Sequence, residues 1–90
     1  MLLETDRSAI VEVANRYGVR QVLLFGSSLD QDKDTTDIDI AVDGIAPGLF
    51  FKFYGELIFK LSKPLDVVDL SMNNSFTDVI RKEGLVIFER

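Results

Sequence analysis

The 90-residue sequence contains neither cysteine nor histidine. Without cysteine it has no disulfides and no cysteine-ligated zinc or iron-sulfur site, which is typical of proteins from a reducing compartment. Without histidine it lacks the usual general base, the commonest transition-metal ligand and every Ser-His-Asp mechanism. Any chemistry must therefore rest on carboxylates and hydroxyl groups, which favour hard cations.

Long apolar runs and excess positive charge are also missing. Glu4, Asp6 and Arg7 interrupt the apolar start, so there is no signal-peptide pattern, and no run approaches membrane-spanning length. Ten basic residues against fifteen acidic ones give a net charge of -5, which disfavours nonspecific binding to nucleic acid. We expect a cytoplasmic protein without a membrane or nucleic-acid partner.

A hydrophobic content of 47% and the chain length predict a single α/β domain over residues 1–90. Apolar periodicity and the positions of glycine and proline predict the element order αβ(α)βαβαβ. The expected elements are a helix at 5–18, a strand at 22–25, a polar turn with at most one helical turn at 27–36, a strand at 37–43, a helix at 49–61, a strand at 65–70, a helix from Ser75 to Gly84 capped by Ser75 and Asp78, and a strand at 85–88.

The strand at 37–43 has an acidic face. Asp37 and Asp39 are two residues apart, so their side chains leave the same face of a strand with Cα atoms roughly 6.5 Å apart. Two unpaired anions repel each other, and a divalent cation would relieve the repulsion. The alternative for an isolated D-x-D pair is the solvent-facing side of an edge strand.

Gly26 and Ser27 follow the apolar strand at 22–25 directly. At such a turn, backbone N–H groups and a hydroxyl converge on a phosphate, although an isolated Gly-Ser pair is as well explained by a turn glycine and a capping serine. Asp66 and Asp69 on the next strand have opposite parity, so only one of them lies on the acidic face.

Together, three ordered segments resemble the DNA polymerase beta superfamily of nucleotidyltransferases, specifically its minimal members: LLFGSS, TDIDIAV and PLDVVDL. The resemblance spans almost the whole chain and implies the superfamily's fold, a small mixed β-sheet with helices packed on it. It also implies an enzyme that transfers a nucleoside monophosphate, AMP from ATP, to a hydroxyl group.

The resemblance assigns a role to each motif residue. Gly26 and Ser27 hold the terminal phosphates of the nucleotide, whereas Asp37, Asp39 and Asp66 are both catalytic and ligands for Mg2+ or Mn2+. Asp66 is selected over Asp69 because it opens the apolar stretch, as the third carboxylate does in the superfamily, and it takes the proton of the attacking hydroxyl.

Similar minimal proteins act as antitoxins beside a helical subunit of the HEPN type and modify a hydroxyl on that toxin. We therefore expect a HEPN-type partner. The helix at 49–61 carries more large apolar residues than one-sided packing requires, which predicts that it forms an interface with that partner or a homodimer. The alternative function is a catalytically weak or inactive binding module that neutralises a helical partner by contact, because Ser28, Leu29 and an acidic run replace the arginines and the small residue that often follow Gly-Ser.

Overall fold

The centre of the fold is a mixed sheet whose two inner strands are β1 (Gln21–Leu24) and β2 (Ile38–Asp43). The computed structural model describes residues 2–29 and 36–90, so the polar segment expected at 27–36 is described only at its ends. The other elements are α1 (Glu4–Arg16), the 3-10 helices η1 (Gly26–Leu29) and η2 (Pro47–Leu49), α2 (Phe50–Lys60), β3 (Leu65–Asp69), α3 (Ser75–Glu83) and β4 (Leu85–Glu89).

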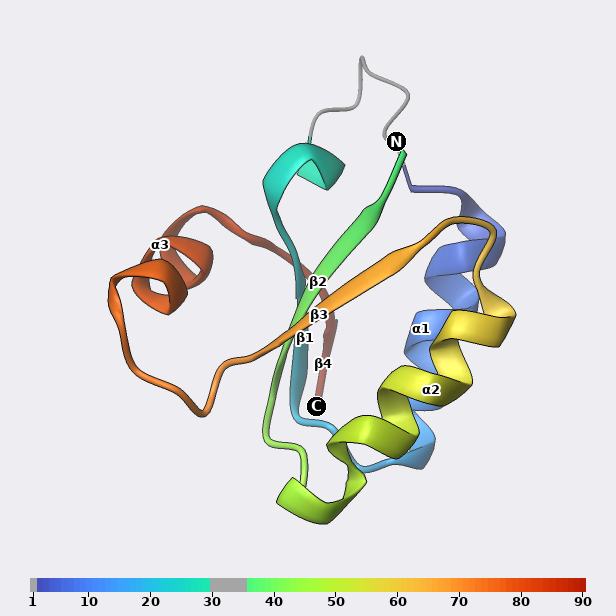
Figure 1. Ribbon diagram of the computed structural model, residues 1–90, viewed down its shortest axis with the longest axis horizontal. Helices are drawn as coiled ribbons and strands as arrows, with labels where there is room; N and C mark the ends of the chain where they lie inside the picture. Colours follow the sequence, from blue (N-terminus) through green and yellow to red (C-terminus); the bar gives the residue numbers. More distant parts are fainter. Residues whose placement is uncertain (1, 30–35) are drawn as a thin grey trace.

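The strand order is β3-β2-β1-β4. β1 runs antiparallel to both β2 and β4, whereas β2 and β3 are parallel and are joined by the crossover helix α2. Figure 1 shows the sheet nearly edge-on, with α1 and α2 on one side and α3 on the other. The sheet is therefore covered on both faces, which explains why β1 is a continuous apolar strand with Val22, Leu23 and Leu24 all buried.

The larger core lies between the sheet and the helices α1 and α2. β2 contributes Ile38, Ile40 and Val42 to it, and α2 contributes Phe53 and Leu57. Phe53 and Leu57 are fully buried, and burial of such a side chain stabilises the fold by about 1.5–3 kcal/mol. The alternation along β2 therefore fixes which face of the strand meets these helices.

The smaller core lies between the opposite face of the sheet and α3. It consists of Leu23, Ala41, Leu70 and Ile80, with Phe25 packed against it. Asp37, Asp39 and Ala41 are separated by two residues each, so the face that carries the small core also carries the acidic residues.

The expected helices and strands outside the segment at 27–36 are all present, with boundaries within two residues, but the predicted N-cap of α3 is wrong. Asn74, not Ser75, caps the helix: its side chain accepts the Thr77 N–H at 2.9 Å, and the Thr77 hydroxyl accepts the Asn74 N–H at 3.0 Å. Asn74 is extended, with φ -153° and ψ 177°, so the helix begins at Ser75, one residue earlier than a Ser75 cap would require.

Within residues 2–29 and 36–90, the structure contains no helix whose length and apolar character would suit it to crossing a bilayer.

Candidate active site

The register of the sheet brings two carboxylates together. Asp39 on β2 is the direct neighbour of Asp66 on the parallel strand β3, whereas Asp69 is the neighbour of Val42 and lies on the opposite face. The Asp69 carboxylate accepts the Ser71 N–H at 2.9 Å, which closes the turn after β3. Because β2 has a strand on each side, Asp39 is not on an edge strand, and the solvent-facing alternative does not apply to it.

The environment of Asp39 disfavours its charge. Burial raises the pKa of Asp39, and the negative charges of Asp66 and then Asp37 raise it further. Asp37 lies just before β2 begins and is exposed. The three predicted carboxylates therefore interact electrostatically, with Asp39 at the centre.

Hard oxygen ligands such as these suit Mg2+ or Mn2+. The uncompensated repulsion at Asp39 also fits a cation, because a positive ion is what would lower the cost of its charge. Among the residues that the structure describes, however, no group of three or more acidic side chains is arranged to hold a metal ion. The register supplies the pair Asp39 and Asp66, and Asp37 is not gathered with them into a complete coordination shell.

Gly26 stands directly against this carboxylate pair. It follows β1 and has φ +65°, a conformation that side chains other than glycine rarely adopt. A Cβ atom at this position would lie 2.9 Å from Asp39 Oδ2. The turn predicted to hold phosphate is therefore adjacent to Asp39, and only glycine allows this approach. Ser27 lies beside it in η1, but its side chain is outside what the structure describes.

Ser28 is a site residue that the sequence did not predict. Its side chain is buried, and its hydroxyl accepts the Asp39 N–H at 2.9 Å and donates to the Asp37 carbonyl oxygen at 3.3 Å. The hydroxyl therefore fixes η1 to the first residues of β2. No signal in the sequence distinguishes Ser28 from its neighbour Ser27, because the two bonds of the Ser28 hydroxyl join residues nine and eleven positions apart.

Tyr54 on α2 contacts the third carboxylate. Its hydroxyl donates to the Leu65 carbonyl oxygen at 2.8 Å and lies 3.4 Å from Asp66 Oδ1. Burial raises the pKa of Tyr54, and the charge of Asp66 adds to this rise. The periodicity of α2 indicated only an apolar position here, so the contact with Asp66 was not predicted.

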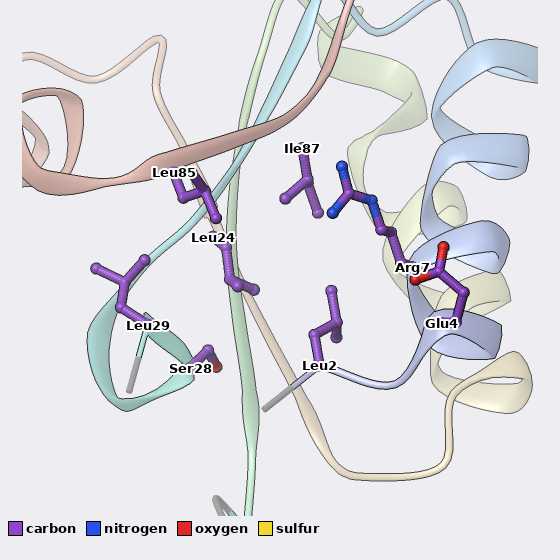
Figure 2. A pocket seen from close by; sticks show the side chains of 8 residues that line it. All are labelled: Leu2, Glu4, Arg7, Leu24, Ser28, Leu29, Leu85 and Ile87. Carbon is purple, nitrogen blue, oxygen red and sulfur yellow. The ribbon is translucent and has the colours of Figure 1, made fainter. Parts of the chain in front are cut away.

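A cavity of about 110 Å³ lies on the other side of η1, under α1. Figure 2 shows Leu24, Ser28 and Ile87 on its walls and the charged side chains Glu4 and Arg7 at its α1 side. Leu24 is the neighbour of Ile40 and so belongs to the face opposite the carboxylates. The cavity is therefore separate from the Asp39 and Asp66 pair.

A family model described as Polymerase beta, Nucleotidyltransferase matches residues 8–90. The chain belongs to the polymerase beta nucleotidyltransferase family. The predicted fold and family are thus confirmed, and the chain contains a nucleotidyltransferase domain. No curated protein matches this family member.

Solved structures with the same fold include three toxin-antitoxin structures. MntA-HepT gives a TM-score of 0.72 at 18% identity, covering 98% of this chain and 74% of the matched one. A mutant of such a pair gives 0.74 at 19% identity, with coverage of 93% and 73%. A toxin-antitoxin structure with AMP-PNP gives 0.75 at 20% identity, with coverage of 98% and 75%. At these identities the likeness shows that this nucleotidyltransferase chain shares their fold.

Proposed function

We propose that this chain transfers AMP from ATP to a hydroxyl group on a helical partner protein of the HEPN type, with Mg2+ or Mn2+ as cofactor. Membership of the nucleotidyltransferase family supports the reaction type. The observation that carries the proposal is the register that places Asp39 beside Asp66, with Gly26 against Asp39. The turn formed by Gly26 and Ser27, called the phosphate turn below, and the carboxylates would then face the same nucleotide.

Each residue has a defined task in this proposal. Gly26 and Ser27 hold the terminal phosphates, and Asp37, Asp39 and Asp66 would hold the metal. When bound, the divalent cations neutralise negative charge on the phosphates and on the leaving group.

Asp66 takes the proton of the acceptor hydroxyl as that oxygen bonds to the α-phosphorus. The bond from the α-phosphorus to the bridging oxygen breaks, and pyrophosphate leaves. Ser28 and Tyr54 act indirectly, by positioning the residues before β2 and the Asp66 carboxylate.

The proposed partner is supported by two observations. The similar solved structures are toxin-antitoxin complexes, and one of them contains AMP-PNP. On the present chain, Phe51 and Phe59 of α2 are 81% and 91% exposed. Exposed large apolar side chains on one helix are typical of an interface.

Incubation of the chain with labelled ATP, Mg2+ and the product of the adjacent gene tests the transfer. We expect label on that protein with the wild-type chain and none with the double variant Asp37→Asn, Asp39→Asn. Transfer at the wild-type rate by the double variant would exclude the mechanism. Omission of Mg2+ with added EDTA should abolish label, and Mn2+ should restore it.

Metal binding has a readout that does not depend on activity. Asp39→Asn removes a repelling charge, so without divalent cations the variant should melt a few degrees above the wild type, since about 1 kcal/mol shifts the Tm of a domain of this size by about 4–8 °C. Mg2+ should raise the Tm of the wild type and leave that of the variant almost unchanged. An equal rise in both proteins would place the metal elsewhere.

The exposed aromatic residues of α2 also favour a second candidate function, neutralisation of the partner by contact alone. In that case the Asp37→Asn, Asp39→Asn variant would suppress the partner's toxicity as well as the wild type does, although no label is transferred. Loss of protection together with loss of label would assign neutralisation to the reaction.

A further inference from the structure

The two carboxylates belong to a row of four residues that crosses the α3 face of the sheet. Leu24 pairs with Ile40 on β2 and with Leu85 on β4. Phe25, the next residue, therefore lies between Asp39 and Gly84, and its N–H donates to the Asp39 carbonyl oxygen at 3.1 Å. Across the sheet the order is Asp66, Asp39, Phe25 and Gly84.

Phe25 and Gly84, at the β4 end of this row, line a cavity of about 350 Å³ between η1 and α3. Phe25 and Gly26 line it from the sheet side, and Phe76, Val79 and Glu83 line it from α3. The rings of Phe25 and Phe76 meet edge to face, with centroids 5.9 Å apart. Phe76 and Val79 are about half exposed, so the cavity is apolar and open to solvent.

We propose that this cavity binds the adenine base of the nucleotide, an inference that rests on the proposed function. Gly26 belongs both to the phosphate turn and to the cavity wall, so a nucleotide held at the turn has its base within reach of the cavity. The aromatic lining suits a purine ring, because bases stack on phenylalanine. The volume is also sufficient for a purine.

The order of the residues Asp66, Asp39, Phe25 and Gly84 across the sheet favours the base over the acceptor as the group that occupies the cavity. Asp66, which takes the acceptor's proton, lies at one end, on β3. The cavity lies beyond Asp39 at the other end. An acceptor in the cavity would be separated from Asp66 by the Asp39 carboxylate, whereas a base there leaves the β3 side open for the acceptor.

Glu83 gives the cavity a preference among purines. Its carboxylate is an acceptor only, so it pairs with the C6 amino group of adenine and opposes the C6 carbonyl of hypoxanthine. Because Glu83 is exposed, water competes and the preference is modest. ATP should bind several times more tightly than ITP, and Glu83→Gln, whose amide both donates and accepts, should reduce that ratio to about one.

The test is calorimetric titration of the full chain, with Mg2+, by ATP, ITP and inorganic tripolyphosphate. Phe76→Ala should raise the Kd for ATP about tenfold, which is the size of effect expected when a base loses an aromatic partner. Val79→Phe fills the cavity and should raise the same Kd. Neither change should alter the Kd for tripolyphosphate, which has no base.

The control is Met72→Ala, because Met72 is 62% exposed, does not line the cavity and should leave every Kd unchanged. An unchanged Kd for ATP in Phe76→Ala, or an equal rise for ATP and tripolyphosphate, would overturn the base site alone. Failure of the wild type to bind ATP or tripolyphosphate would instead overturn the proposed function. An unchanged ratio of ATP to ITP affinity in Glu83→Gln would overturn the role of Glu83.

Discussion

Gly26 is the residue at which the turn proposed to hold phosphate approaches the carboxylates. Gly26→Ala places a Cβ atom 2.9 Å from Asp39 Oδ2 at a backbone φ of +65°. We expect a loss of about 1–2 kcal/mol in stability from the backbone conformation and at least a tenfold loss of kcat/KM for ATP from displacement of Asp39. Thermal denaturation and steady-state kinetics measure the two effects separately.

Gly48 offers a matched control for this substitution. It lies in η2, and a Cβ atom there would meet no atom within 4 Å. Gly48→Ala should therefore leave both stability and kcat/KM close to those of the wild type. If the two alanine variants had the same stability and the same kcat/KM, the close approach of Gly26 to Asp39 would have no role in function.

Asp66 and Asp69 differ by the face of β3 on which they lie. Asp66→Ala should lower kcat by about a hundredfold or more, because it removes the proposed base. Asp69→Ala removes the bond to the Ser71 N–H and should cost only about 0.5–1.5 kcal/mol of stability. Single-turnover assays with each variant decide the assignment, and greater damage from Asp69→Ala would reverse it.

At the scale of single residues, the sequence predicted which side chains share a face of a strand, because alternate residues of a strand point to opposite faces. The separation of Asp66 from Asp69 follows from the two-residue repeat alone and agrees with the register found. The bonds of the Ser28 and Tyr54 hydroxyls join residues nine or more positions apart. Such contacts depend on how the strands and helices pack, which no local pattern specifies.

Among the elements, the helices α1 and α2 are joined by a polar contact between the C-terminal end of α1 and Glu56 of α2. Glu56 accepts from Arg16 Nη1 at 3.0 Å and from the Tyr17 hydroxyl at 3.1 Å. The hydrogen bond from Arg16 holds the pKa of Glu56 below its ordinary value, although partial burial opposes this. A lowered pKa means that the folded state favours the charged form.

The resulting stabilisation is present above the ordinary glutamate pKa of about 4.3 and is lost as pH falls through the lower pKa of the folded state. Glu56→Gln should therefore lower the Tm at pH 7, and the difference from the wild type should shrink as pH falls below the ordinary glutamate pKa. Glu12→Gln is the control, because Glu12 is mostly exposed and lies 3.9 Å from the same arginine. A difference in Tm between wild type and Glu56→Gln that stayed the same from pH 3 to 7 would show that the charged contact is not stabilising.

The positions of the helices and strands were predictable because each has its own apolar periodicity and is bounded by glycine, proline or capping residues. Gly18, with φ +71°, ends the first helix as expected, and the apolar run before Gly26 is an inner strand. The cap of α3 was mispredicted because Asn74 and Ser75 are both good N-caps, and only the position of buried Thr77 decides between them. Strand pairing was not predictable, since β1 and β4 meet across more than sixty residues.

At the scale of the whole molecule, α2 carries an exposed apolar surface. Phe53 and Leu57 face the core, whereas Phe51 and Phe59 are exposed. We predict that this surface binds either the helical partner or a second copy of the chain. Sedimentation of the chain, alone and with the partner, should show an assembly. Phe51→Glu and Phe59→Glu should each dissociate this assembly. Neither substitution should change the stability of the fold much, because a charge on an exposed side chain costs little.

Met72→Glu is the control, since Met72 is also exposed but lies outside α2. A chain that stays monomeric, ignores the partner and is unaffected by either substitution would show that α2 has no interface role. Dissociation of the homodimer but not of the heteromeric complex would assign the surface to self-association.

The position of β3 in the sheet has a consequence for amide hydrogen exchange. Asp39 is on a strand bonded on both sides, whereas Asp66 is on β3, which among the described strands is an edge strand paired with β2 alone. Amides of β1 and β2 should therefore exchange slowly, at rates set by global unfolding, and those of β3 faster, through local opening. The two carboxylates thus join a slowly exchanging half of the site to a rapidly exchanging one. A ligand bridging them should slow exchange chiefly in β3, since that strand has the most protection left to gain.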